Sequence, residues 1–594
     1  MTNYYAPIEE MMFVLQELGN LDGICRIPGN EEVTTDIVEA ILEQSAQLTS
    51  EIVAPTNRIG DLKGTYVEND QVVVPEEYRE VYGHYMEGGW ATLAEHEEFG
   101  GQGLPQIVGV PVEEMWQSAN LAFTLCPFLS KGAGRVIALH GDQALKEIWM
   151  PKLVSGEWTA TMDLTEPQAG SDLAALKTKA VPEGDHYLIT GQKIFITWGD
   201  HELVDNIVHL VLARLPDAPP GVKGISLFLV PKFILDEKGE LGKRNDFYAV
   251  SVEHKMGIHG CPTCVMSFGD NGGATGYLVG EPNKGLTAMF TLMNHARVTV
   301  GLQGVSLSER AYQQALAYAK ERVQGNIPGQ EERVTIIKHA DVRRMLMLMK
   351  AYTEAMRALI YTATASLDYS LISPDEKDRK FHQARLDLLT PIAKAWCSEM
   401  VRETTSLAIQ VHGGMGFVEE TGVAQYFRDC RISSIYEGTT GIQARDFIGR
   451  KLIRDNFRSM KVLMEEMKSL LGEFDDAGND LAPIRSALET SLARLENSLD
   501  FVINKVQMDY DFQGAISVDL LMLSGTVTAT WLMGKSALAA QRRLDNKQGN
   551  QSFNETKIVT ARFFCEHITP LSSSYEQRIL AGHESIMALP EDRF

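Results

Sequence analysis

Residues 162–172 read Met-Asp-Leu-Thr-Glu-Pro-Gln-Ala-Gly-Ser-Asp, and residues 191–199 read Gly-Gln-Lys-Ile-Phe-Ile-Thr-Trp-Gly. The small and hydroxyl residues of the first stretch are typical of a turn that offers backbone N–H groups and hydroxyls to a planar heterocycle or a phosphate. The same composition is typical of an ordinary turn at the entrance to a β domain. Composition alone therefore leaves both interpretations open.

The segment around these two stretches favours β-structure. Short runs rich in β-branched and aromatic residues recur between Gly, Pro and Asp turns, at 186–190, 193–197, 207–212 and 225–230. Residues 161–283 are accordingly predicted to form a small middle β domain.

Helical periodicity dominates on both sides of that segment. Residues 35–160 are predicted to form an N-terminal helical domain after an extension at 1–34, and residues 284–460 a helical bundle. The acidic, glycine-containing stretch 473–480 is typical of a linker, and residues 461–594 are predicted to form an additional helical domain. The predicted fold class is α+β, mostly α.

Composition limits the possible functions. A formal net charge of −24 disfavours nucleic-acid binding, because phosphates are repelled. Seven cysteines, an odd number spread over 594 residues, favour free thiols in a reducing compartment, and the N-terminal segment lacks a basic n-region. We therefore expect a cytoplasmic location. Residues 520–534 are apolar but shorter than the roughly 20 residues that span a bilayer, so a buried helix is predicted and no transmembrane segment.

A second informative stretch, residues 433–443, reads Ser-Ser-Ile-Tyr-Glu-Gly-Thr-Thr-Gly-Ile-Gln. Glu437 stands between an aromatic ring and a glycine, where a poorly hydrated pocket raises the pKa of a carboxyl toward the range useful for proton abstraction. A helical pattern follows at Ile442, Phe447 and Ile448, and a carboxylate before a helix is also favourable for electrostatic reasons alone. Residues elsewhere in the chain must decide between these interpretations.

Four motifs occur in the order and spacing of the acyl-CoA dehydrogenases: Thr-Glu-Pro-x-Ala-Gly-Ser-Asp, Gly-Gln-Lys-x-x-Ile-Thr, Gly-Gly-x-Gly-Phe and Tyr-Glu-Gly-Thr. Residues 35–455 resemble that family. The resemblance implies an N-terminal helical domain, a middle β-barrel domain and a C-terminal helical bundle. It also implies a flavoenzyme in which a carboxylate removes the α-proton of an acyl-CoA while hydride passes from Cβ to N5 of FAD, forming the trans-2-enoyl-CoA.

Glu437 corresponds to the family's catalytic base. Some relatives carry the base on a helix instead, at the position of Ala296, which cannot accept a proton. Catalysis by Glu437 is therefore expected. The resemblance implies FAD contacts from Met162, Leu164, Thr165, Phe195, Ile196, Thr197, Arg322, Gln410, Gly413, Gly414, Thr439 and Gly441. It implies substrate contacts from Ser171, Asn294, Arg297, Tyr436 and Gly438.

Some positions depart from the family pattern or allow a second interpretation. Gln324 replaces an aromatic residue near Arg322, so the sequence departs from the family pattern at the position where the resemblance implies a contact with a neighbouring subunit's FAD. Arg297 is equally explained by a buried ion pair. Cys261 and Cys264 have CxxC spacing without a second cysteine pair, so ordinary thiols are favoured and no metal site is predicted.

The two ends of the chain resemble the long bacterial subgroup of the family, whose members act on 3-methylmercaptopropionyl-CoA or on fatty acyl-CoAs. The acyl chain stays open between these. The added C-terminal domain predicts a homodimer, because in longer relatives it occupies the face where a second dimer docks. Electron-transfer flavoprotein is the expected electron acceptor. The alternatives are an acyl-CoA oxidase that uses O2 and a non-catalytic, DNA-associated relative of the fold.

Overall fold

The computed structural model describes residues 4–329, 331–475, 478–505 and 510–594. They divide into two compact units. The first contains the residues up to Ala46, residues 105–118 and the chain from Arg297 onward; the second contains residues 47–104 and 119–296. Helix α6 (Gln106–His140) contributes to both, since its backbone leaves the helical conformation at Asn120. The Asn120 side chain accepts a hydrogen bond from the backbone N–H of Phe123 at 3.1 Å and so caps the second half of the helix.

A large β-sheet forms the centre of the second unit. Its strands follow the order β10-β11-β5-β12-β7-β6-β3, with β4 paired to β5. The pairing of β3 with β6 is parallel, and the other pairs in this sheet are antiparallel. The strands are β3 (Thr159–Asp163), β4 (Lys179–Glu183), β5 (His186–Thr197), β6 (Ile207–Ala213), β7 (Ser226–Pro231), β10 (Phe247–Val252), β11 (Thr263–Phe268) and β12 (Ala274–Leu278).

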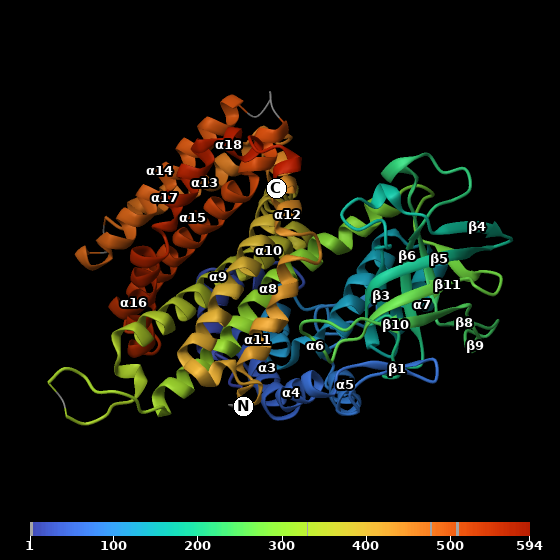
Figure 1. Ribbon diagram of the computed structural model, residues 1–594, viewed down its shortest axis with the longest axis horizontal. Helices are drawn as coiled ribbons and strands as arrows, with labels where there is room; N and C mark the ends of the chain where they lie inside the picture. The colour runs from blue at the N-terminus through green and yellow to red at the C-terminus, as the bar shows by residue number, and fades with distance from the viewer. Residues whose placement is uncertain (1–3, 330, 476–477, 506–509) are drawn as a thin grey trace. The chain divides into compact units, whose positions relative to one another are not determined.

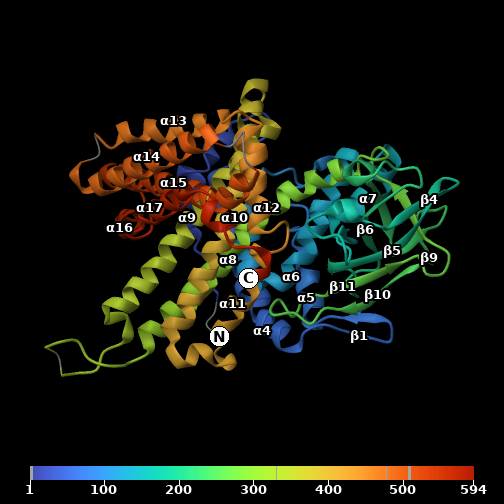
Figure 2. The same ribbon diagram turned by 45° about the horizontal axis from the view of Figure 1, so that its top comes forward.

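Helices and two small hairpins complete this unit. The helices are α4 (Ala54–Lys63), α5 (Glu77–Glu87), the second half of α6, α7 (Gln143–Ser155) and the start of α8 (Gly285–Glu321). The hairpins pair β1 (Tyr66–Glu68) with β2 (Gln71–Val73), and β8 (Phe233–Leu235) with β9 (Leu241–Arg244). Figure 2 shows β5, β10 and β11 lying side by side, in agreement with their pairing.

The first unit is helical. Helix α8 (Gly285–Glu321) enters it at Arg297, and α9 (Ala340–Ile372) lies alongside α10 (Glu376–His412), as Figure 1 shows. Its N-terminal part contains α1 (Ile8–Glu17), α2 (Leu21–Cys25) and most of α3 (Thr35–Leu48). The remaining helices are α11 (Val423–Cys430), α12 (Thr440–Asp446), α13 (Arg458–Glu473), α14 (Ala482–Lys505), α15 (Tyr510–Asp545), α16 (Gln551–His567), α17 (Leu571–Ala581) and α18 (Glu584–Met587).

Helix α15 is the core helix of the C-terminal part, where it packs against α14, α16 and α17. The apolar stretch 520–534 lies inside it and is buried, as predicted. The helix is 36 residues long, so by length and composition alone it is long enough to cross a membrane. Because 89% of its most apolar window is buried inside the fold, we assign it to the core.

The predicted fold class is confirmed, with strands between helical segments. One detail differs from the sequence pattern: the runs 186–190 and 193–197 form a single strand, β5, because Gly191 and Gln192 continue the ladder and pair with Phe268 and Ser267. The predicted linker 473–480 lies between α13 and α14, and residues 476–477 within it are outside the described residues.

Candidate active site

In the second unit, hydrogen bonds hold the first two motifs side by side. The Thr161 hydroxyl donates to the carbonyl of Thr197 at 2.8 Å, and the backbone N–H of Ile194 donates to the carbonyl of Thr165 at 2.9 Å. Residues 162–165 therefore lie beside residues 195–197. These two short segments contain the six residues of this unit that the resemblance assigns to FAD.

Glu166 organises the first of these segments. Its carboxylate accepts hydrogen bonds from the Lys177 and Thr178 backbone N–H groups, the Thr178 hydroxyl and the Lys193 ammonium at 2.6–3.0 Å. Lys193 also donates to the carbonyl of Leu164 at 3.1 Å. Burial acts to raise the pKa of Glu166, but the Lys193 charge and these hydrogen bonds outweigh it and lower that pKa to about 2. Glu166 is thus ionised near neutral pH and structural.

The second segment is strained. Phe195 (φ 60°) and Trp198 (φ 55°) both adopt the left-handed conformation, which is unfavourable for bulky residues and often marks a functional site. The Phe195 side chain is 58% exposed, whereas Trp198 is buried and donates from its indole N–H to the carbonyl of Ala122 at 3.1 Å. Ile196 belongs to the hydrophobic core of the sheet. Thr197 is partly accessible between them.

In the first unit, Glu437 occupies a tight turn before α12. Glu437 (φ 56°) and Gly438 (φ 89°) are both left-handed. Thr439 follows as the N-cap of α12, and its hydroxyl oxygen accepts a hydrogen bond from the backbone N–H of Ile442 at 3.3 Å. The predicted helix after Glu437 is therefore present, and Glu437 lies before it with a backbone conformation that is not helical.

The surroundings of Glu437 favour a protonatable carboxyl. Burial raises its pKa above the ordinary value, while the positive charges of Arg297 and Lys394 act to lower it. Part of the residue remains accessible to solvent. Among the described residues, no hydrogen bond to its carboxylate is found, in contrast to Glu166. A carboxylate without hydrogen-bond donors is free to accept a proton.

The two cations lie on α8 and α10, which approach each other closely. A Cβ added to Gly301 would come within 2.9 Å of the carbonyl oxygen of Ala393, and one added to Gly304 within 2.8 Å of that of Cys397. Glycine is thus required on α8 at the contact with α10. This contact places the α10 segment containing Lys394 against α8.

Lys394 and Gln443 were not singled out from the sequence, yet both contact the Glu437 turn. The Lys394 ammonium donates to the carbonyl of Gly438 at 2.8 Å, and the Gln443 amide donates to the carbonyls of Glu437 at 3.0 Å and Gly438 at 3.3 Å. Both residues are fully buried. A lone lysine in the run Leu-Leu-Thr-Pro-Ile-Ala-Lys-Ala-Trp-Cys is the sequence signal that points to Lys394.

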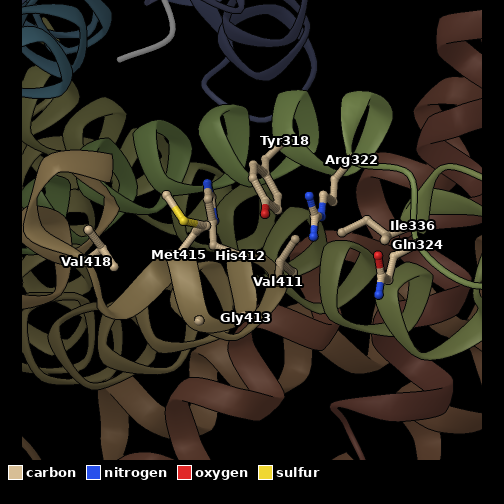
Figure 3. A pocket seen from close by; sticks show the side chains of 10 residues that line it. Tyr318, Arg322, Gln324, Ile336, Val411, His412, Gly413, Met415 and Val418 are labelled. Atoms are coloured by element: carbon tan, nitrogen blue, oxygen red, sulfur yellow. The ribbon is translucent and has the colours of Figure 1, made fainter.

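An open cleft of about 430 Å³ lies where α8 and α10 end (Figure 3). It brings Arg322 together with Gly413 and Gly414, three residues assigned to FAD by the resemblance. His412 is stacked on Tyr318 at 4.4 Å between ring centroids, and its Nδ1 lies 2.7 Å from the carbonyl of Ala408. A Cβ on either glycine would meet no atom within 4 Å, so this side of the cleft is unobstructed.

The remaining predicted site residues have varied environments. Arg297 forms a buried ion pair with Asp446 at 3.2 Å, which supports its structural interpretation. The hydroxyl of Tyr436 donates to the side-chain carbonyl of Gln303. Gln410 and Ser171 are exposed, and Gly441 lies in the first turn of α12. The side chain of Asn294 is outside the described residues.

The CxxC cysteines are ordinary buried thiols. Neither Cys261 nor Cys264 forms a disulfide, and both are fully buried. Burial raises the pKa of Cys264 to about 12, which is unfavourable for thiolate chemistry. Over the part of the chain that the structure describes, no group of His, Cys, Asp and Glu suitable for a metal ion is found.

Models of the acyl-CoA dehydrogenase family match most of the chain. The N-terminal domain matches residues 40–157, the middle domain residues 161–271 and the C-terminal domain residues 283–453. A model described as acetyl-CoA dehydrogenase C-terminal like matches residues 463–590. The chain belongs to the acyl-CoA dehydrogenase family, an FAD-binding family of oxidoreductases.

Individual relatives cover the whole length. The chain is 43% identical to 3-methylmercaptopropionyl-CoA dehydrogenase of Ruegeria pomeroyi, over 98% of this chain and 99% of the relative. It is 35% identical to the broad-specificity linear acyl-CoA dehydrogenase FadE5 of Mycobacterium tuberculosis, over 100% of both. Its fold is similar to that of a Bacillus anthracis acyl-CoA dehydrogenase complexed with FAD, with a TM-score of 0.73, 22% identity and coverage of 96% and 91%.

Proposed function

We propose that this chain is an FAD-dependent acyl-CoA dehydrogenase in which Glu437 removes the α-proton of the thioester. The observation that carries the proposal is the state of the Glu437 carboxyl: burial raises its pKa, and among the described residues it accepts no hydrogen bond. An α C–H is a weak acid, so the base must have a raised pKa and an unoccupied acceptor. The chain's membership of the acyl-CoA dehydrogenase family supports α-proton abstraction from an acyl-CoA as the reaction of this carboxyl group.

The residues present fit FAD. The cleft at the ends of α8 and α10 offers the Arg322 guanidinium and the unobstructed backbone of Gly413 and Gly414, a combination suited to a phosphate or ribose. In the second unit, residues 162–165 and 195–197 would hold the flavin ring, with the exposed ring of Phe195 beside it. FAD, when bound, supplies the acceptor for the hydride that leaves Cβ.

The chain's own residues carry the proton transfer. Glu437 would accept the α-proton, and the turn at Gly438 would fix the direction of its side chain. The Glu437 backbone N–H would stabilise the developing negative charge on the thioester oxygen. Tyr436 would line the acyl pocket, and Ser171 and Asn294 would contact the substrate.

We propose 3-methylmercaptopropionyl-CoA as the first substrate to test, with linear fatty acyl-CoAs as the alternative. The full-length 43% identity to the Ruegeria enzyme supports the first, and the 35% identity to the broad-specificity enzyme supports the second. Electron-transfer flavoprotein is the proposed acceptor, and the cytoplasm the proposed location.

We also propose a homodimer. Phe417 is 91% exposed next to the glycine loop of the cleft, and Met415 and Val418 are exposed beside it. Apolar side chains gathered on a surface loop favour coverage by another chain. A sedimentation-velocity experiment that shows a monomer or a tetramer at working concentration would contradict the dimer.

One anaerobic titration tests the activity. Purified holoenzyme is mixed with 3-methylmercaptopropionyl-, butyryl-, octanoyl- or palmitoyl-CoA, and the flavin absorbance is followed. The substrate should bleach the flavin, and a lack of bleaching by any of the four would overturn the proposed reaction. Admitting O2 afterwards separates a dehydrogenase from an oxidase, because an oxidase regains its colour with peroxide formation.

Glu437→Gln tests the base. The variant should keep FAD and bind acyl-CoA, while the rate of flavin bleaching falls by a factor of about 10³ or more, since general-base catalysis is typically worth 10²–10⁴. Glu465→Gln is the matched control, because Glu465 lies on α13 and pairs with the exposed Lys468. Bleaching of the Glu437 variant at a near-normal rate would exclude Glu437 as the base.

A further inference from the structure

The turn that contains Glu437 is energetically unfavourable by itself. A non-glycine residue in the left-handed conformation is strained and persists only when surrounding contacts determine it. Here Glu437 (φ 56°) is followed by Gly438 (φ 89°), so two consecutive residues depart from ordinary backbone. Other residues must hold this turn in place.

Two buried donors perform this task. Lys394 on α10 donates to the carbonyl of Gly438 at 2.8 Å, and Gln443 on α12 donates to the carbonyls of Glu437 and Gly438 at 3.0 Å and 3.3 Å. The fit is close, because a Cβ on Gly438 would come within 2.8 Å of the Gln443 Nε2 atom. Donors from two different helices therefore fix both carbonyls of the turn.

A neutral side chain would suffice as a donor, so the charge of Lys394 needs its own explanation. Burying an ammonium group is costly unless a negative charge compensates it. The charged groups that act on Lys394 are Glu437 in the turn, Arg297 on α8 and Glu399 on α10. Arg297 is itself paired with Asp446 at 3.2 Å. Burial lowers the pKa of Lys394 to about 7, and the Glu437 charge opposes that change.

We propose that Lys394 is a positioning residue for proton abstraction: with Gln443 it clamps the turn that carries Glu437, and its ammonium group stabilises the ionised carboxylate. The inference rests on the proposed role of Glu437 as the base. It assigns to Lys394 two separable effects. The hydrogen bond fixes the backbone, and the charge sets the pH at which Glu437 becomes able to accept a proton.

The test compares the holoenzyme with Lys394→Met and Lys394→Arg. Lys535→Met is the matched control, because Lys535 is a largely buried lysine of α15 that lies 5.1 Å from the Trp531 ring, and no contact of Lys535 with the Glu437 turn is found among the described residues. Two quantities are measured: hydrogen exchange of peptides covering residues 433–443, and the pH dependence of kcat/KM. The first needs no turnover, so it tests the clamp even if no acyl-CoA proves to be a substrate.

Lys394→Met should exchange the turn amides about 10-fold faster, with the flavin content retained and kcat reduced about 10–100-fold. Removing the cation raises the pKa of Glu437, so the acidic limb of kcat/KM should move to higher pH by about one unit. Lys394→Arg keeps the positive charge, so its acidic limb should lie closer to that of the wild type than the limb of Lys394→Met does. Lys535→Met should leave both quantities unchanged.

Different results overturn different statements. If Lys394→Met exchanges the turn amides as wild type does, the clamp is excluded. If its acidic limb stays in place while the wild type is active, the electrostatic role is excluded. If Lys394→Met does not fold, Lys394→Leu, which also lacks a hydrogen-bond donor and a charge, replaces it in the same comparison. Failure of all acyl-CoAs to bleach the wild type overturns the proposed function instead, and hydrogen exchange still decides the clamp.

Discussion

Replacing Glu166 by glutamine tests how the first motif is held together. The substitution keeps the shape of the side chain and removes its charge. Lys193, whose side chain is fully buried, then loses the carboxylate 2.9 Å from its ammonium nitrogen. Burial already lowers the pKa of Lys193 to about 8 in the presence of Glu166. Without the carboxylate, the lysine must lose its proton or remain as an uncompensated charge.

The pKa of Glu166 sets the magnitude. Its ordinary value of 4.5 falls to about 2 in the fold, which at about 1.4 kcal/mol per unit corresponds to about 3 kcal/mol of folding stability. Partial solvent screening reduces this to about 2 kcal/mol. Because the folded pKa is the lower one, this stability is fully present above pH 4.5 and is lost as the pH falls toward 2.

Thermal unfolding followed by circular dichroism measures the effect. At pH 7, Glu166→Gln should unfold about 4–8 °C below wild type. At pH 3.5 the difference should be clearly smaller, because the wild type has by then lost part of the contribution from Glu166. Glu183→Gln, on the exposed part of β4, is the control. A difference of the same size at both pH values would refute the electrostatic reasoning, and so would an unchanged unfolding temperature at pH 7.

Three further predictions concern the Glu437 turn. Gly438→Ala places a Cβ 2.8 Å from the Gln443 side-chain amide, at a φ of 89° that is unfavourable for alanine. We expect turnover to fall about 10–100-fold while FAD is retained. Flavin bleaching at the wild-type rate in a stopped-flow experiment would contradict this. Asp446→Asn leaves the buried Arg297 without its ion-pair partner, so the free energy of unfolding should fall by about 3 kcal/mol. A urea titration measures this, and an unchanged midpoint would show that the ion pair adds no stability. Because burial raises the pKa of Glu437, the wild-type kcat/KM should rise with pH through a midpoint above 4.5, and a pH-independent kcat/KM from pH 4 upward would exclude the raised pKa.

The sequence predicted the features that depend on local pattern. The alternation of helical and β-prone segments gave the fold class, and the periodicity after Glu437 predicted α12. The four motifs pointed to the family, and family models match the chain from residue 40 to residue 590. Local signals of this kind are contained within a few residues of each other, so a single sequence is sufficient to detect them.

Contacts between distant residues were not predictable in the same way. Lys394 and Gly438 are 44 positions apart, and their hydrogen bond joins α10 to the turn before α12. No periodicity encodes such a contact. The positive φ of Glu437 could not be predicted from the sequence either, because that backbone conformation is unusual for a residue other than glycine.

Each unit contains a buried lysine near a glutamate, but the pKa of the glutamate is lowered in one unit and raised in the other. In each, a buried lysine donates to a backbone carbonyl of a motif, Lys193 to Leu164 and Lys394 to Gly438, and a glutamate compensates its charge. Glu166 is saturated with hydrogen-bond donors and has a pKa of about 2, so it cannot serve as a base near neutral pH. Glu437 has a raised pKa, and no hydrogen bond to its carboxylate is found among the described residues. At Glu166 the charge of Lys193 together with the hydrogen bonds outweighs burial, whereas at Glu437 burial dominates, and this difference separates a structural glutamate from one able to take a proton.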